Sequence, residues 1–259
     1  MPWDSFDGGV KPKELTICGL AAVRAQFAAD PGAIKRLYFD YATGRRIGVI
    51  CRTLAQRKKI YRCVEPAELE KVGGTLHHGG IVAVVEAPEM REPAAADLTA
   101  WVKRCEPLLV LDRIGNAHNL GAIARTAAFF GLPRLILPRD PAAAQPSEAA
   151  YRVAEGGMTH LELARVDDLP AFLRSLVAAG YDVIGAATRG GLPQAQSHTG
   201  KPIALVLGNE EHGLSAEVAA ACTRLVTIPG SGKVESLNVS VAGAVLIWEL
   251  LVRAPRGTR

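Results

Sequence analysis

The sequence predicts an α/β protein in which a small unit precedes a larger one built on a parallel sheet. Apolar runs such as Leu108–Leu111 and Ile203–Leu207 are almost continuous, which is typical of strands buried on both faces. Segments with the 3.6-residue spacing of an amphipathic helix lie between these runs. A stretch rich in Pro and Ala, residues 87–107, interrupts the alternation. These three observations place one α/β unit on either side of a linker.

The first unit is predicted from alternating helix and strand patterns. A helix is expected to start at Pro66, because proline lacks the N–H that the first helical turn leaves unpaired anyway. Gly79 and Gly80 delimit the apolar run that follows. The expected elements are a helix over Leu15–Ala29, strands over Ile34–Phe39 and Lys59–Val64, a helix over Pro66–Val72 and a strand over Ile81–Val85.

The boundary between the units follows from composition. Residues 87–107 have weak periodicity, although Leu98–Cys105 is compatible with one or two helical turns. We expect a first domain over residues 12–87, a linker over 88–106 and a second domain over 107–255.

The second unit continues the alternation of strands and helices. One helix starts near Asp168 and stops at Gly180, because glycine tolerates the left-handed backbone that ends helices. Residues 138–160 receive no assignment, since a Pro-Ala loop and a Gly-Gly turn obscure any periodicity. The other expected elements are strands over Leu108–Leu111, Leu135–Leu137, Val183–Ala186 and Ile203–Leu207, a strand ending in Ile228-Pro229, and helices over Leu120–Phe130 and Val239–Val252.

Basic residues are concentrated in one part of the chain. The formal net charge is only +4, yet residues 35–62 hold nine Lys and Arg against the single acid Asp40. Such a block suits a polyanion, since each neutralised phosphate releases counterions. A solvated protein face is the ordinary alternative, but nucleic acid explains the density better. Aromatic residues interleave with the block, as candidates either for stacking on unpaired bases or for buried strand positions: Tyr38, Phe39, Tyr41 and Tyr61.

The five cysteines favour neither a disulfide framework nor a zinc site. They are odd in number, far apart and never spaced as C-x-x-C. No leader with a basic and an apolar region is recognisable, and no apolar run is long enough to span a bilayer. We therefore expect a cytoplasmic protein that does not act on a membrane.

Polar loops follow three of the apolar strands, and ligands of open α/β sheets bind beyond the carboxyl ends of the strands. The first loop contains Asn119, a candidate helix N-cap, and leads into a helix with Arg125, whose guanidinium can bind a phosphate or carboxylate bidentately. The second loop runs from Gly208 to Gly213. Its Glu210, Glu211 and His212 are adjacent and cannot easily converge on one ion, so we expect no metal.

The third loop follows Ile228-Pro229 and ends in an apolar helix. Ser236 or Asn238 is expected to cap this helix, whose N-terminus can meet a polar or anionic ligand. Lys233 lies in Gly-Ser-Gly-Lys-Val, which lacks both the first glycine and the final hydroxyl residue of a phosphate-binding P-loop.

Together the three loops resemble the motifs of the SpoU/TrmH branch of SPOUT RNA methyltransferases. The first motif resembles Asn119-x-Gly121-x-x-x-Arg125-Thr126-Ala127, and the second resembles Gly208-x-Glu210-x-x-Gly213-Leu214. The third resembles Ile228-Pro229 followed by Ser236-Leu237-Asn238-Val239-Ser240. Order and spacing agree over about residues 107–252. Residues 14–87 are similar to the auxiliary RNA-binding domain of the family, a small α/β sandwich, through residues 17–23 and 77–83.

The resemblance implies a deep trefoil knot at the C-terminal end of the second domain. It also implies S-adenosyl-L-methionine as methyl donor, a ribose 2′-hydroxyl of tRNA or rRNA as acceptor, and a homodimer whose active site lies across the interface. The apolar helix Val239–Val252, with Trp248, suits burial in a knot or an interface.

Site residues also follow from the resemblance and from the basic block. The implied catalytic residues are Asn119, Arg125, Glu210, Ser236 and Asn238. The implied cofactor-binding residues are Leu207, Gly208, Asn209, Glu210, Gly213, Ile228, Pro229, Ser236, Leu237 and Asn238. The residues expected to bind RNA are Arg24, Arg45, Arg46, Arg52, Arg57, Lys58, Lys59 and Arg62.

Arg125 is expected to act through its positive charge. The family pattern casts the matching residue as the base, whereas a guanidinium stays protonated at any working pH. We therefore expect Arg125 to clamp an RNA phosphate and to favour the ionised hydroxyl electrostatically. Asn119 and Glu210 would orient the ribose hydroxyl, while Ser236 and Asn238 would shape the third loop.

Two positions depart from the family pattern, and two other functions stay open. Glu155 stands where a small or hydroxyl residue is expected, and Gly230 follows Pro229 where Met is common. A non-catalytic RNA-binding or ribosome-assembly protein that keeps the fold is one alternative, although all five polar candidates are present. A nucleotide-binding α/β enzyme that acts on a small metabolite is another, but it leaves the basic block unexplained.

Overall fold

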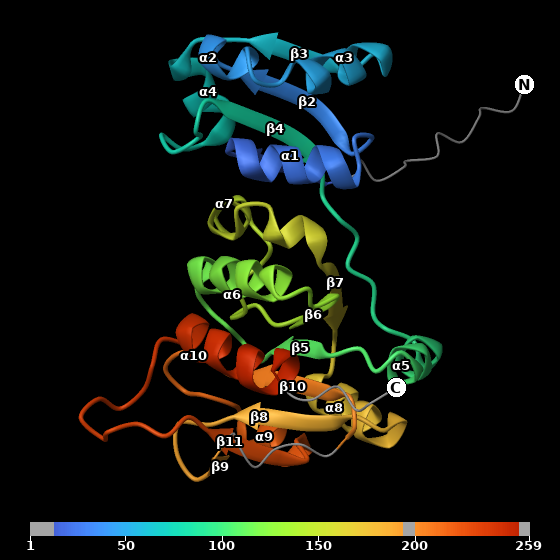
Figure 1. The fold of residues 1–259 in the computed structure, drawn as a ribbon, viewed down its shortest axis with the longest axis vertical. Helices are drawn as coiled ribbons and strands as arrows, with labels where there is room; N and C mark the ends of the chain where they lie inside the picture. Colours follow the sequence, from blue (N-terminus) through green and yellow to red (C-terminus); the bar gives the residue numbers. More distant parts are fainter. Residues whose placement is uncertain (1–12, 194–199, 254–259) are drawn as a thin grey trace, which may run out of the picture.

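The computed structural model describes residues 13–193 and 200–253, which form two sheets, each covered by helices (Figure 1). The four-stranded sheet belongs to the N-terminal unit, at the top of Figure 1, and the seven-stranded sheet to the C-terminal unit. All paired strands of the larger sheet are parallel. The predicted α/β fold, with a parallel sheet and a small N-terminal sheet domain, is therefore confirmed.

The N-terminal unit is an α/β sandwich. Its strands are β1 (Glu14–Cys18), β2 (Ile34–Phe39), β3 (Ile60–Cys63) and β4 (Ile81–Glu86), and its helices are α1 (Leu20–Ala29), α2 (Tyr41–Gly44), α3 (Gly48–Gln56) and α4 (Pro66–Gly73). The sheet order is β1-β4-β2-β3, with β4 antiparallel to both its neighbours. Val23 of α1 and Leu54 of α3 join one core, while Leu69 of α4 packs on the other side against Val82.

The predicted helix over Leu15–Ala29 is wrong in its first third. Residues Glu14–Cys18 form β1, which pairs with β4 along its whole length. Leu15 and Ile17 point into the core with the two-residue period of a strand, and Gly19 then turns the chain into α1 with a φ of 95°. The helical pattern of α1 hides this short strand, because the partner strand lies far away in sequence.

The C-terminal sheet has the order β7-β6-β5-β10-β8-β11-β9. Its strands are β5 (Leu108–Leu111), β6 (Arg134–Pro138), β7 (Glu162–Val166), β8 (Asp182–Ala186), β9 (Leu192–Pro193), β10 (Ile203–Leu207) and β11 (Arg224–Thr227). Its helices are α5 (Ala95–Lys103), α6 (Ala117–Phe129), α7 (Glu148–Ala154), α8 (Leu169–Ala179), α9 (Ala216–Ala221) and α10 (Val239–Leu246), which continues as a π-helical turn over Ile247–Val252.

Alternate side chains of the buried strands serve two cores. Leu109 and Leu111 of β5 pack with α6, α7 and α10, whereas Leu108 and Val110 pack with α5, α8 and α9. Burial of each Leu or Val side chain contributes roughly 1.5–3 kcal/mol to the stability of the fold. Both faces are covered, and this explains why the strands read as unbroken apolar runs.

Three details of the C-terminal unit differ from expectation. Asn116, not Asn119, is the N-cap of α6, since its Oδ1 accepts from the backbone N–H of His118 at 2.7 Å. The unassigned segment holds α7 and a 3₁₀ turn over Gly157–His160. The strand expected to end in Ile228-Pro229 is β11, which ends at Thr227.

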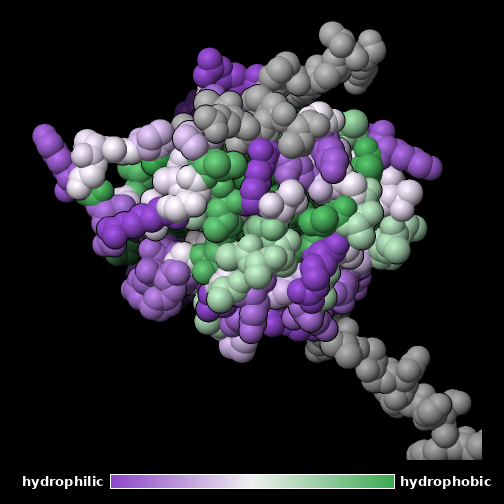
Figure 2. Space-filling view, turned by 90° about the horizontal axis from the view of Figure 1, so that it is seen from below, coloured by the Kyte–Doolittle hydropathy of each residue, from purple (hydrophilic) through white to green (hydrophobic). Residues whose placement is uncertain are grey.

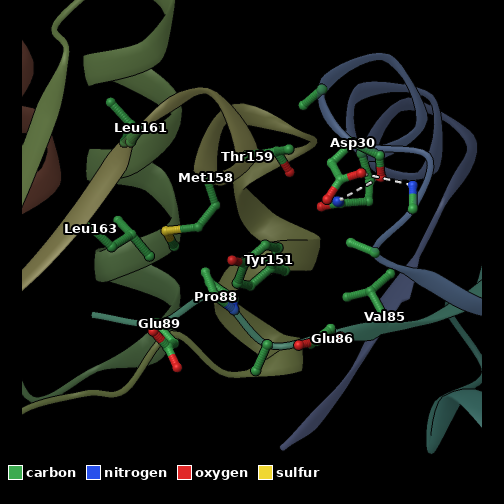
Figure 3. A pocket seen from close by; sticks show the side chains of 15 residues that line it. Asp30, Val85, Glu86, Pro88, Glu89, Tyr151, Met158, Thr159, Leu161 and Leu163 are labelled. Carbon is green, nitrogen blue, oxygen red and sulfur yellow. Dashed lines mark hydrogen bonds between the residues drawn. The ribbon is translucent and has the colours of Figure 1, made fainter. Parts of the chain in front are cut away.

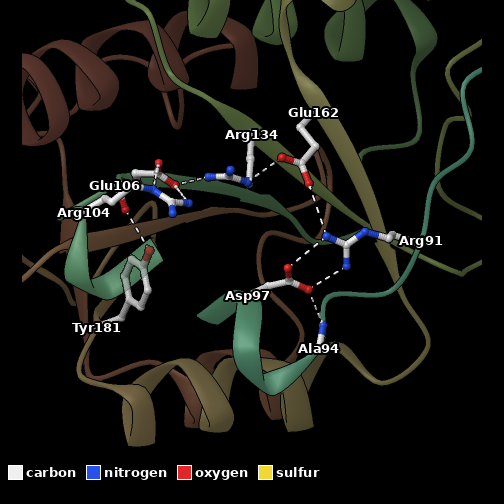
Figure 4. A network of polar contacts seen from close by, with 8 residues as sticks. All are labelled: Arg91, Ala94, Asp97, Arg104, Glu106, Arg134, Glu162 and Tyr181. Carbon is white, nitrogen blue, oxygen red and sulfur yellow. Dashed lines mark hydrogen bonds and ion pairs between the residues drawn. The ribbon is translucent and has the colours of Figure 1, made fainter. Parts of the chain in front are cut away.

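An ion-pair network fixes the segment between the two sheets (Figure 4). Arg91 binds Asp97 of α5 through two hydrogen bonds of 2.6 and 3.0 Å. Arg134 of β6 lies between Glu106 and Glu162, and its guanidinium stacks on Trp101 at 4.5 Å from the ring centroid. The segment therefore lies against the C-terminal unit instead of hanging free.

The two units touch through α1 and β1 on one side and α7 with its following 3₁₀ turn on the other. Figure 1 shows α1 directly above α7.

At the opposite end, where α9 and β11 lie, apolar side chains form a band across an otherwise polar surface (Figure 2). Within residues 13–193 and 200–253, no helix is both long and apolar enough to cross a membrane.

Candidate active site

The first and second polar loops leave the sheet side by side. β5 and β10 are parallel neighbours, with Leu111 opposite Leu207 at their carboxyl ends. The backbone N–H of Asp112 donates to the carbonyl of Leu207 at 2.8 Å, which extends the pairing by one residue. Helix α6 follows the first strand and α9 the second, so the loops open at the point where the strand order reverses.

Buried polar contacts lock these two loops together. The carboxylate of Asp112, which is 2% exposed, accepts a hydrogen bond from the backbone N–H of Ser215 at 2.7 Å. The side chain of Asn209 donates to the carbonyl of Arg113 at 2.9 Å. Sequence reasoning missed Asp112 and Ser215, although an acid directly after a buried apolar strand is a usable signal.

Glu210 is the centre of the site. Its carboxylate accepts from the backbone N–H groups of Gly115 at 3.1 Å and Asn116 at 3.4 Å, and from Asn119 Nδ2 at 2.8 Å. Burial alone would raise the pKa of Glu210, but the donors, Asn119 foremost, hold that pKa below its ordinary value. Glu210 is therefore an ionised acceptor, and a poor proton acceptor at neutral pH.

Asn119 carries the contact on to the third loop. Its Oδ1 accepts from Asn238 Nδ2 at 3.2 Å. Asn238 Oδ1 in turn accepts from the backbone N–H of Ser240 at 2.9 Å and caps α10. A carboxylate only accepts, so the orientation of both amides is set from the Glu210 end. Of the two predicted caps of the last helix, Ser236 and Asn238, the structure shows Asn238 in that position.

The second loop closes in a tight turn. Asn209 and Gly213 exchange two backbone hydrogen bonds of 2.9 Å across the turn. A Cβ on Gly208 would lie 2.4 Å from the carbonyl carbon of Gly213, so only glycine fits there. Leu207, directly before the turn, is buried in the core, and Ile228 packs against the same core.

The third loop lies open in the single chain. All residues from Pro229 to Asn238 are exposed, and Leu237 is 51% exposed. Within the described part of the chain, Ser236 makes no hydrogen bond, so the structure does not join it to Asn119, Glu210 and Asn238. The remaining predicted cofactor residues, Pro229 and Leu237, lie on the same loop.

Arg125 lies apart from this cluster. It is six residues beyond Asn119 on α6, which corresponds to about 9 Å along the helix axis. Its Nη2 lies 3.0 Å from Glu155 Oε2, and both side chains are 55% exposed. The structure thus brings together Asn119, Glu210 and Asn238, but not Arg125, within one chain.

The predicted RNA-binding residues share one property. All eight lie on the N-terminal unit, seven are exposed and Lys59 is half-buried. Among the described residues none of the eight forms an ion pair, whereas Lys35 and Arg36 in the same basic block are paired with Glu86 and Glu14. Arg24 of α1 donates to the carbonyl of Arg46 at 3.3 Å, which connects the helix to this surface.

The cavity between the two units is separate from the loops (Figure 3). It measures about 460 Å³ and is lined by Tyr151, Met158 and Leu163 from one unit and by Asp30 and Val85 from the other. None of the motif residues lines it. In residues 13–193 and 200–253, no cluster of three potential metal ligands occurs.

Fold and site together define a two-unit α/β protein with a polar cluster at the switch point of a parallel sheet. The SpoU rRNA methylase family matches residues 106–248, and residues 16–91 match the substrate-binding domain of RNA 2′-O ribose methyltransferases. The chain belongs to the SpoU rRNA methylase family.

Named relatives agree with this assignment. The tRNA/rRNA methyltransferase YfiF of Escherichia coli O157:H7, described as uncharacterized, is 32% identical and aligns over 92% of this chain and 68% of its own length. The 23S rRNA (guanosine-2′-O-)-methyltransferase RlmB of Nitrosomonas europaea is 32% identical over 90% of this chain and 89% of its own.

Solved structures show the same fold. The SpoU methyltransferase AviRb of Streptomyces viridochromogenes, in complex with AdoMet, has a TM-score of 0.72 at 25% identity and covers 91% of this chain and 88% of its own. An rRNA methyltransferase of Sinorhizobium meliloti has a TM-score of 0.74 at 24% identity, with 91% and 86% covered.

Proposed function

We propose that this protein is an S-adenosylmethionine-dependent methyltransferase that modifies a ribose 2′-hydroxyl of ribosomal or transfer RNA. The observation that carries the proposal is the continuous chain of hydrogen bonds from Glu210 through Asn119 to Asn238. It joins all three family motifs, which follow β5, β10 and β11 of the same parallel sheet. Relatives that align over most of this chain are ribose methyltransferases of 23S rRNA.

The second and third loops are suited to S-adenosylmethionine. The backbone of Gly213 packs directly on Gly208, and this close contact fixes the shape of the second loop. When bound, the cofactor supplies an electrophilic methyl group on a sulfonium. The residues that would hold it are Leu207, Gly208, Asn209, Glu210, Gly213, Ile228, Pro229, Ser236, Leu237 and Asn238.

The chain itself must position the ribose hydroxyl and stabilise its ionised form. The ionised Glu210 fixes Asn119, and Asn119 fixes Asn238, so two amides are held ready to orient a substrate oxygen. Ser236 shapes the third loop beside them. Arg125 stays charged, binds an RNA phosphate and lowers the energy of the developing alkoxide electrostatically.

The N-terminal unit would deliver the RNA. Its eight candidate side chains are free of carboxylate partners among the described residues, and this leaves their charges available to phosphates. Tyr41, which is 75% exposed, and Tyr61, which is 39% exposed, lie in the same unit and are available to stack on unpaired bases.

A homodimer would complete the site. Phe129, Val241, Val245 and Trp248 on α6, α10 and its continuation are exposed large apolar side chains, and such a surface favours a partner. A second copy placed there would cover the open third loop and would bring another Arg125 to the cluster. The trefoil knot stays a prediction from the family pattern, and the cytoplasmic location stays one from the cysteine spacing. The domain limits 12–87, 88–106 and 107–255 stay predictions from composition.

Methyl transfer to RNA tests the proposal directly. Purified protein is incubated with radiolabelled S-adenosylmethionine and total RNA from a strain lacking the gene, and ribose methylation is mapped. We expect label at one position of ribosomal or transfer RNA. No transfer, together with no cofactor binding by calorimetry, would favour the alternative of a non-catalytic RNA-binding protein.

A further inference from the structure

Arg125 is held by a residue that departs from the family pattern. The partner of its guanidinium, within the described residues, is Glu155 at 3.0 Å. Glu155 ends α7 in the left-handed conformation, with φ 45° and ψ 43°, which a glutamate rarely adopts. The backbone therefore bears a conformational penalty to place this carboxylate beside Arg125.

The two glycines after Glu155 fix the segment between two helices. A Cβ on Gly157 would lie 2.9 Å from the Cα of Arg125, so the backbone at this glycine packs directly on α6. A Cβ on Gly156 would lie 2.8 Å from the Cβ of Ala25 in α1. The segment is thus wedged between the helix that carries Arg125 and the N-terminal unit.

Helix α1 also reaches the basic surface. Arg24 lies next to Ala25 in sequence, and it donates to the carbonyl of Arg46 at 3.3 Å. A continuous set of contacts therefore runs from the predicted RNA-binding surface through α1 and Gly156 to Glu155 and Arg125.

We propose that Glu155 is a positioning residue that acts on RNA through Arg125. It binds Nη2, so that the remaining N–H groups of the guanidinium point as a fixed fork toward the RNA phosphate. The fixed fork orients the bound phosphate. The negative charge of Glu155 also repels that phosphate and makes RNA binding weaker. The inference rests on the proposed function, because it assumes that Arg125 contacts RNA.

The test separates RNA affinity from chemical rate. Glu155→Gln keeps the size of the side chain and removes its charge. We expect it to tighten binding to total ribosomal RNA, measured by filter binding, and to slow single-turnover methyl transfer, each by about two- to fivefold, the range of an exposed ion pair. A merely structural role would instead weaken both, with a loss of thermal stability.

Arg125→Gln provides the second arm of a double-mutant cycle. In the Arg125→Gln background, Glu155→Gln should leave the rate unchanged and should alter RNA affinity less than in the wild type. Asp167→Asn is the matched control, since Asp167 and Arg139 form an ion pair of similar exposure on the same unit. It should change neither quantity.

Additive effects of the two substitutions, or weaker RNA binding by a folded Glu155→Gln variant, would overturn the inference. If Glu155→Gln does not fold, Glu155→Asn serves in its place, because asparagine tolerates the left-handed backbone. A wild-type protein that binds RNA but transfers no methyl group would sink the proposed function instead, and the binding cycle would still decide the role of Glu155.

Discussion

Asn119 and Glu210 are 91 residues apart in sequence, yet Asn119 Nδ2 donates to Glu210 Oε1 at 2.8 Å. The contact exists because β5 and β10, which precede the two loops, are neighbours in the sheet. The order of strands in space, and not the order of residues, therefore builds the polar cluster.

Asn119→Asp should disable the cluster. The new carboxylate would face the carboxylate of Glu210, and it could no longer donate a hydrogen bond. Loss of a hydrogen bond to a charged group predicts a fall of about tenfold to a hundredfold in single-turnover methyl transfer. His118→Ala, at an exposed neighbour on the same turn, is the control and should retain the wild-type rate. An active Asn119→Asp variant would contradict the assigned role.

Gly208→Ala should weaken cofactor binding, because its Cβ would lie 2.4 Å from Gly213 and distort the turn. The matched control is Gly230→Ala, since a Cβ on Gly230 meets nothing within 4 Å. Calorimetry with S-adenosylmethionine should show wild-type affinity for the control and at least about a tenfold loss for Gly208→Ala. Equal affinities would place the cofactor elsewhere.

Three basic residues without carboxylate partners should account for part of the salt dependence of RNA binding. The variant Arg45→Gln/Arg46→Gln/Arg52→Gln should lower the slope of log K against log salt by about 0.7–0.9 for each RNA phosphate that the protein no longer neutralises. Lys35→Gln/Arg36→Gln removes charges that are already paired with Glu86 and Glu14, so its slope should change much less. The reverse ranking would move the RNA to another surface.

The Arg91–Asp97 pair should make stability depend on acid. Hydrogen bonds from Arg91 and from the backbone N–H of Ala94 lower the pKa of Asp97 from 3.8 to about 2. A carboxyl with a lowered pKa stabilises the fold fully above pH 3.8, and this contribution is lost as the pH falls toward about 2. The difference in urea midpoint between wild type and Asp97→Asn should therefore shrink over that interval. A constant difference would show that the charge of Asp97 is not what stabilises the fold.

Trp248→Glu should separate the proposed dimer into monomers and stop methyl transfer. A charge in the centre of an apolar interface is left desolvated and unpaired. Sedimentation should show an increase of at least about tenfold in the dimer dissociation constant. Leu76→Glu, at a side chain that is 72% exposed and outside this surface, is the control. A dimeric Trp248→Glu variant would place the interface elsewhere.

The sequence predicted an element best where residues within or next to that element determine where it begins and ends. The strand over Ile203–Leu207 matches the structure, and Asp168 and Gly180 cap α8 as expected. β1 was missed because its partner is β4, and α7 was missed because its turn is irregular. The contact of Arg125 with Glu155 could not be predicted, since it depends on how α6 and α7 pack.

The covering of the C-terminal sheet includes α5, whose Leu98 and Trp101 lie in the same core as Leu108 and Val110. A fragment that begins at residue 107 would lack this helix, and the apolar face of the sheet would be exposed to solvent and prone to aggregation. An isolated C-terminal unit should therefore begin before Arg91, so that it contains α5 and the ion pairs that hold this helix in place.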